Sequence, residues 1–120
     1  MKIYKFAIAS LISAFSLWSP SAAALSAEDY LKSRNTEPLI AYLYGAFDAY
    51  NWANSRLDTS GREMLYCLPP TMRLGSANFF SLIDEQMKRL KERKDSKAQP
   101  PVDLLLLLGL EENFPCTIRK

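Results

Sequence analysis

From residue 26 onward, apolar residues recur at steps of three and four, the spacing of amphipathic α-helices. The pattern predicts four helices: a short one from Ser26 to about residue 34, one from about residue 37 to 58, one over 76–93, and one over 101–113. Ser26 is placed to cap the first helix. Since no period-two alternation marks a strand, the expected fold class is all-α, a small four- to five-helix bundle.

The second and third helices each carry an apolar stripe that predicts a buried face. In the second helix the stripe is Leu39, Leu43, Ala46, Phe47, Tyr50 and Ala53–Asn54, and in the third it is Phe80, Ile83, Met87 and Leu90, flanked by Phe79, Leu82 and Gln86. Gly45 and Ala49 lie four residues apart beside the first stripe. They either let another helix come close or are merely tolerated small residues.

The last helix has no stripe, because Leu104 to Leu108 are five consecutive leucines. A helix that is apolar all round needs cover on most sides. It is therefore expected either to be central in the bundle or to supply a dimer contact as well.

Two proline pairs separate these helices. Pro69-Pro70 forbids a regular helix, so residues 64–70 are expected to be an extended connection held by Cys67. Pro100-Pro101 closes a polar, cationic segment from Glu92 to Gln99.

Residues 1–24 form a different kind of segment. Lys2 and Lys5 precede an apolar run from Phe6 to Trp18, Pro20 ends the run, and Ala22-Ala23-Ala24 is a small-residue cleavage pattern. This order is typical of a secretory signal peptide, with the cut expected after Ala24. A transmembrane anchor is the alternative, but the run is shorter than the roughly 20 residues that span a bilayer. Residues 25–120 are then expected to be a single helical domain in the periplasm.

Charge limits the partners of that domain. Removing Lys2 and Lys5 lowers the 15 basic residues to 13, which equals the 13 acidic residues. A neutral domain lacks the concentrated positive face that nucleic acids require. For the same reason, no membrane partner is expected for the mature form.

Cys67 and Cys116 are the only cysteines. After export, such a pair usually forms a disulfide, and a domain this small needs the help. A metal pair or a redox couple are the alternatives. Two thiols without histidine make a poor zinc site, and the spacing is unlike C-x-x-C.

Candidate catalytic groups are few. The chain has no histidine, which excludes Ser-His-Asp and Cys-His arrangements, and its four glycines form no phosphate-binding loop. The carboxylate neighbours Asp84-Glu85 and Glu111-Glu112 point in different directions on a helix, so solvation explains them better than acid–base chemistry. An enzyme is not expected, and neither is a cofactor or a metal.

Several features together resemble the type VI secretion amidase immunity family, the Rap/Tai immunity proteins. They are the signal peptide, the helix with Tyr42-Leu43-Tyr44-Gly45 and Ala49, the turn Tyr66-Cys67-Leu68-Pro69, and the terminal Phe114-Pro115-Cys116. The resemblance covers most of residues 25–120, and the two cysteine motifs in their order are its specific part.

The resemblance implies a periplasmic, all-α protein, commonly a homodimer, that binds a cognate peptidoglycan amidase effector and spares kin cells. It implies a Cys67–Cys116 disulfide and an inhibitory loop between late helices that enters the amidase groove. The matching segment is 92–99, so Arg93, Lys94, Asp95, Ser96 and Lys97 are the expected effector-binding residues.

A small acid-protective periplasmic chaperone is the alternative. Such proteins are also exported, helical and held by one disulfide, and Leu104–Leu108 could supply the apolar surface they expose at low pH. An exported binding domain of unrelated function is a third possibility.

Overall fold

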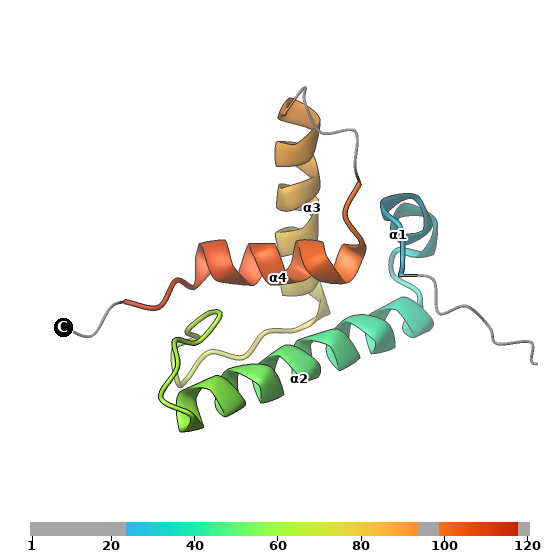
Figure 1. Cartoon of the computed structure of the whole chain (residues 1–120). Coiled ribbons are helices and arrows are strands. Elements are labelled where there is room, and N and C mark those ends of the chain that lie inside the picture. Colours follow the sequence, from blue (N-terminus) through green and yellow to red (C-terminus); the bar gives the residue numbers. More distant parts are fainter. Residues whose placement is uncertain (1–23, 94–98, 118–120) are drawn as a thin grey trace, which may run out of the picture.

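The computed structural model describes residues 24–93 and 99–117 and shows four helices (Figure 1). They are α1 (Ala27–Ser33), α2 (Glu37–Thr59), α3 (Ser76–Glu92) and α4 (Val102–Asn113). No strand occurs in these two ranges, which confirms the all-α class and a small bundle. Apart from Ala24, the expected signal peptide lies outside the described residues.

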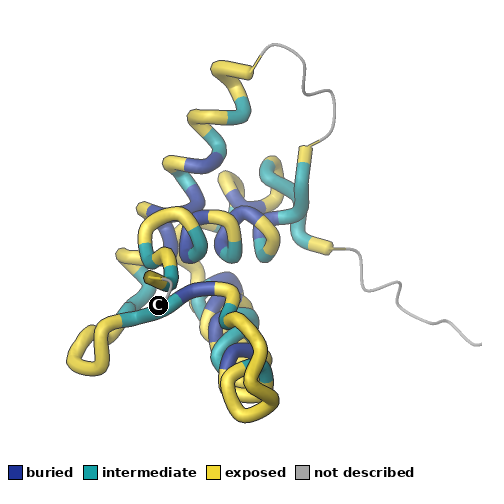
Figure 2. Tube along the Cα trace, turned by 60° about the vertical axis from the view of Figure 1, so that its left-hand side comes forward, coloured by how far each residue is buried: buried dark blue, intermediate teal, exposed yellow. Residues whose placement is uncertain are grey.

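The helices are arranged around the crossing of α3 and α4. In Figure 1, α4 crosses α3, α2 runs beneath both, and α1 lies beside the start of α2. α4 packs against both α2 and α3, and α2 also contacts α3. Buried residues gather where the helices meet, whereas the outer ends are exposed (Figure 2). None of the helices in the described chain combines the length and apolar character needed to cross a membrane.

Local signals explain where the first helices begin. The Ser26 hydroxyl accepts a hydrogen bond from the Asp29 amide at 3.1 Å, so it caps α1 as predicted. Asn35 has a positive φ of 66° and turns the chain between α1 and α2. Pro38 lies in the first turn of α2, where its missing amide is not needed.

The core is built from one face of each long helix. Its fully buried residues include Leu43 of α2, Phe79 and Ile83 of α3, and Leu105, Leu106 and Leu110 of α4. Phe79 packs between two other aromatic rings: its ring centroid lies 5.0 Å from that of Phe47 and 5.1 Å from that of Tyr44.

The predicted stripes are correct in part. Leu39, Leu43, Phe47 and Asn54 are buried in α2, while Ala46 and Tyr50 are half-buried and Ala53 is exposed. In α3, Phe79, Leu82 and Gln86 are buried and not merely flanking, whereas Met87 and Leu90 are half-buried. The buried face of α3 is rotated from the prediction because α4 lies against the side that carries Leu82 and Gln86.

The five leucines of α4 divide between core and surface. Leu105 and Leu106 are buried, Leu107 is half-buried, and Leu104 and Leu108 are 40% and 37% exposed. α4 is therefore a central helix that also presents an apolar edge.

The connection between α2 and α3 is extended and is held at several points. Asn54, itself buried, donates to the Tyr66 carbonyl at 2.8 Å and accepts from the Leu65 amide at 2.8 Å. The Cys67 amide donates to the Phe114 carbonyl at 2.8 Å. Cys67 and Cys116 form the predicted disulfide, with a Cα–Cα distance of 4.9 Å. The bundle and its covalent staple are thus confirmed.

Loss of this disulfide should destabilise the domain strongly. The bond closes a separation of 49 residues, for which the chain-entropy treatment gives about 4 kcal/mol. We expect the Cys67→Ser/Cys116→Ser double variant to lose about 2–4 kcal/mol of unfolding free energy in urea, followed by circular dichroism. Dithiothreitol should lower the midpoint of the wild type and leave that of the double variant unchanged. Equal midpoints for oxidised wild type and double variant would contradict this expectation.

Two glycines provide a matched pair for the crossing of α3 and α4. A Cβ at Gly109 would lie 2.9 Å from Leu82 Cβ and 3.2 Å from the Leu82 carbonyl oxygen, whereas a Cβ at Gly45 meets nothing within 4 Å. We expect Gly109→Ala to lower the unfolding free energy by about 1–3 kcal/mol, because the helices must move apart. Gly45→Ala should raise it by up to about 1 kcal/mol. The urea midpoints of both variants test the crossing, and a neutral Gly109→Ala would contradict it.

Candidate binding surface

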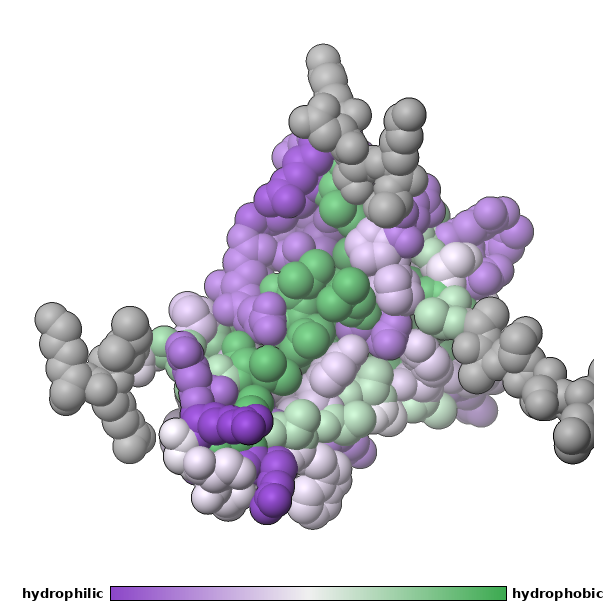
Figure 3. Space-filling model, in the orientation of Figure 1, coloured by the Kyte–Doolittle hydropathy of each residue, from purple (hydrophilic) through white to green (hydrophobic). Residues whose placement is uncertain are grey.

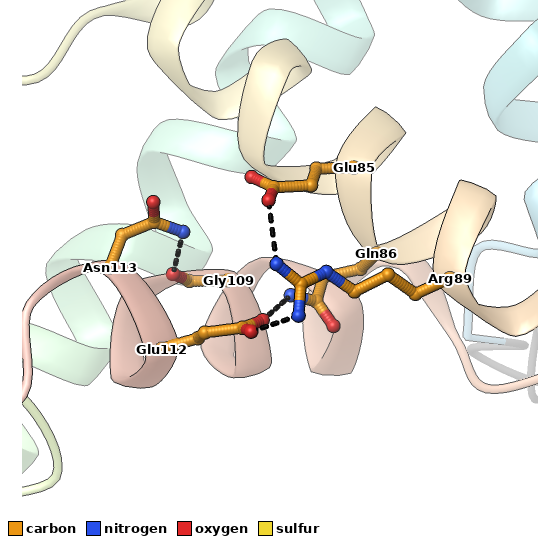
Figure 4. Close-up of polar contacts among 6 residues, drawn as sticks. All are labelled: Glu85, Gln86, Arg89, Gly109, Glu112 and Asn113. Carbon is orange, nitrogen blue, oxygen red and sulfur yellow. Dashed lines mark hydrogen bonds and ion pairs between the residues drawn. The ribbon is translucent and has the colours of Figure 1, made fainter.

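A polar cluster joins the last turn of α4 to the middle of α3 (Figure 4). Arg89 donates to Glu85 on its own helix at 2.8 Å and to Glu112 on α4. Gln86 Nε2 donates to the second oxygen of the same Glu112 carboxylate at 2.6 Å. The hydrogen bond to Glu85, together with the charges of Glu112 and Glu85, raises the pKa of Arg89. Glu112 therefore holds α4 against α3 through both of its oxygens.

Beside this cluster lies a groove of about 390 Å³ between the C-terminal half of α3 and the outer side of α4. Its lining combines cations, carboxylates and leucines: Gln86, Arg89, Leu90, Arg93, Leu105, Leu108, Glu111 and Glu112. Both signs of charge meet an apolar floor here, a composition suited to holding part of a protein partner.

An apolar edge continues from the groove along α4. Leu104 and Leu108 are one helical turn apart and are partly exposed, and we call this pair the leucine edge. In the space-filling view a hydrophobic band covers α4 and is bordered by the hydrophilic surface of α3 (Figure 3). Because Leu108 also lines the groove, the edge and the groove form one continuous surface.

The predicted effector-binding residues can be placed only at their start. Arg93 is the exposed C-cap of α3, and it lines the groove. Lys94, Asp95, Ser96 and Lys97 lie outside the described residues. The structure thus brings Arg93 together with Leu108 and Glu111, which the sequence did not connect to it.

Three of the four carboxylates considered as acid–base candidates have other partners. Asp84 accepts from the Tyr30 hydroxyl at 2.9 Å and pairs with Arg34 at 2.6 Å. Glu85 and Glu112 bind Arg89. In the described ranges, no cluster of three or more His, Cys, Asp or Glu residues is placed to hold a metal.

A second exposed apolar surface lies on α2. Trp52 is 76% exposed and Tyr44 40%, and Gly45 and Ala49 are exposed beside them. No described residue comes within 4 Å of a Cβ built at Gly45, so no helix of this chain's described part uses the small-residue face. Sequence reasoning missed Trp52, although its position seven residues after Gly45 places it on the same helix face.

Comparisons with protein-family models, with curated proteins and with solved structures found no match to this chain.

Truncating Gln86 should weaken the junction of α3 and α4. Its side chain is buried and donates to a charged carboxylate, a type of bond that contributes about 1.5–3 kcal/mol. We expect Gln86→Ala to lower the unfolding free energy by about that amount, measured by urea denaturation. Glu111→Ala is the matched control, because Glu111 makes no hydrogen bond to a described side chain, and it should stay within about 0.5 kcal/mol. Equal losses in the two variants would contradict a role for Gln86 at this junction.

Proposed function

We propose that this chain is a periplasmic immunity protein that binds a type VI secretion peptidoglycan amidase and occludes its active-site groove. The proposal rests on the resemblance of the cysteine motifs to the Rap/Tai immunity proteins, together with the predicted signal peptide. A helical domain held by the Cys67–Cys116 disulfide is compatible with localisation in an oxidising compartment.

One observation supports the location of the partner surface. Arg93, at the root of the predicted inhibitory loop, lines the same groove as Leu108 of the leucine edge. A loop carrying Arg93, Lys94, Asp95, Ser96 and Lys97 would therefore leave the domain beside an apolar surface that a partner can bury. Charged and hydroxyl groups would fill the amidase groove, while burial of Leu104 and Leu108 would supply affinity at its rim.

The homodimer implied by the resemblance is part of the proposal. It needs a self-complementary apolar patch, and the described surface offers two, the leucine edge and the α2 face around Trp52. We assign the leucine edge to the amidase, because it adjoins Arg93, and leave the α2 face for a second copy of the chain.

Protection of cells is the direct test. A type VI amidase exported to the periplasm of a sensitive bacterium should lyse the cells, and co-expression of this chain should prevent lysis. A variant lacking residues 2–24 should fail to protect, because it stays in the cytoplasm. Replacing Arg93–Lys97 with alanine should weaken binding to the purified amidase at least tenfold, without changing the urea midpoint.

The control for the loop variant is Glu28→Ala/Lys32→Ala, which removes an exposed ion pair on α1 far from Arg93 in sequence. It should bind and protect like the wild type. If the loop variant inhibits as strongly as the wild type, the loop assignment is wrong. If the folded, oxidised protein protects against no amidase in a panel, the immunity function itself is wrong.

The exposed leucine edge also favours the second candidate, an acid-protective chaperone. Such a protein would suppress aggregation of denatured periplasmic proteins near pH 3, and Leu104→Ser/Leu108→Ser would abolish that suppression. An immunity protein would show no chaperone activity and would lose amidase binding in the same variant. Aggregation and binding measured on one pair of samples therefore separate the two functions.

A further inference from the structure

Asp103, in the first turn of α4, has a buried carboxylate oxygen, Oδ1, without a hydrogen-bond donor. Its Oδ1 is inaccessible to solvent and accepts no hydrogen bond from the described residues. None of the ion pairs in the described part of the chain involves Asp103. A buried carboxylate oxygen without a donor costs free energy, so the position calls for a cation or a hydrogen-bond donor.

The chain segment next to this carboxylate contains the predicted cleavage point. The Leu25 carbonyl accepts a hydrogen bond from the Val102 amide at 2.9 Å, which places Leu25 across the start of α4. Leu25 and Tyr42 also line one pocket of about 540 Å³, together with Ser33, Thr36, Pro38 and Leu39. Leu25 is half-buried and packs against the core, so it is held there by the fold.

Tyr42 connects Leu25 to Asp103. Burial raises the pKa of the Tyr42 phenol, the charge of Asp103 raises it further, a hydrogen bond with the Leu25 backbone lowers it, and a hydrogen bond with the Asp103 carboxylate raises it. The Leu25 backbone and the Asp103 carboxylate thus both affect the pKa of the Tyr42 hydroxyl. The Leu25 backbone and the Asp103 carboxylate therefore both lie next to a single phenol group.

We propose that Asp103 and Tyr42 form a binding site for an α-ammonium group, and that its occupant is the N-terminus of Leu25 released by signal-peptide removal. In the precursor, Leu25 nitrogen is an amide with one N–H and no charge. Hydrolysis of the Ala24–Leu25 bond by a signal peptidase consumes one water, leaves a carboxylate on Ala24 and an amine on Leu25, and the amine takes up a proton. The resulting cation has three N–H donors beside the inaccessible Oδ1 of Asp103.

The surroundings determine the sign of the pH dependence. From α2, Tyr42 and Tyr50 face Asp103, and the Tyr50 hydroxyl donates to the Asp103 carbonyl at 2.8 Å. Burial first, and then the Asp103 charge, raises the pKa of Tyr50 to about 12, so it is neutral below pH 10. On α1, the carboxylates Glu28 and Asp29 are exposed to solvent. On α3, Asp84 already accepts a hydrogen bond from Tyr30 and forms an ion pair with Arg34. Asp103 is half-buried, and its inaccessible Oδ1 is thus the charged oxygen that the ammonium meets.

Pairing with Asp103 raises the pKa of the α-amino group above its ordinary value of about 7.7–8.0. A group with a raised folded pKa stabilises the fold fully below its unfolded pKa, and that stability is lost as the pH rises through the folded pKa. The stabilisation should therefore be present at pH 6–7 and disappear at alkaline pH.

The experiment compares full-length genes whose products are purified from the periplasm. Mass spectrometry of the wild-type product should give a chain that starts at Leu25. A second gene carries Gly-Ser inserted after Ala24, which moves the ammonium about 7 Å along the chain. At pH 7 we expect the inserted product to melt about 4–8 °C lower, a normal shift for a domain of this size that loses one stabilising contact. The gap should close above pH 10.

Asp103→Asn in both genes completes the test. In the wild-type background it should remove the advantage of the free Leu25 terminus, and with the Gly-Ser insertion it should change the melting temperature little. NMR titration should give a raised α-amino pKa for the wild type and an ordinary one for the other products. A product that starts elsewhere, an ordinary α-amino pKa in the wild type, or equal losses for Asp103→Asn in both backgrounds overturns the proposal. Should Asp103→Asn fail to fold, the insertion and the titration still decide.

The proposal shares signal-peptide removal with the proposed function but requires no amidase. Failure of protection by a chain that starts at Leu25 would refute the immunity function and leave the ammonium site intact. A raised α-amino pKa would in turn say nothing about the partner of the leucine edge.

Discussion

The arrangement of the other elements depends on the close contact between α4 and α3 at Gly109. Because Gly109 has no side chain, the backbone of α4 lies directly against Leu82, and the flanking Leu106 and Leu110 enter the core on either side. A side chain at Gly109 would separate the helices, and the bonds from Arg89 and Gln86 to Glu112 could not then form with the same geometry. The groove and the leucine edge both depend on this close approach.

Both ends of α4 are tied to chain segments from elsewhere in the sequence. At its start, Val102 bonds to Leu25, and after its end, Phe114 bonds to Cys67 beside the Cys67–Cys116 disulfide. These ties compensate for a core that is small, since a domain of about 100 residues buries only a modest share of its surface. They also leave the middle of α4 as the section whose outer side, with Leu104 and Leu108, is exposed.

The helices and the disulfide could be predicted because their signals are local or compositional. Ser26 and Pro38 mark helix starts by chemistry that acts within one turn. The orientation of α4 could not be predicted, since five identical leucines carry no period, and α2 and α3 decide that Leu106 is buried and Leu108 is not. Of the candidate site, Arg93 was predicted as a binding residue, whereas Glu112 is 23 residues from Arg89 and had no local signal.

The position of Trp52 determines what the intrinsic tryptophan fluorescence of this protein can report. It is the only tryptophan after residue 24, and with 76% of its surface exposed it is already in contact with solvent in the folded domain. Its emission changes little when the core melts, and it shifts to shorter wavelengths when something covers the outer face of α2. The intrinsic tryptophan fluorescence of the domain is therefore suited to detecting association at the outer face of α2 and poorly suited to following unfolding.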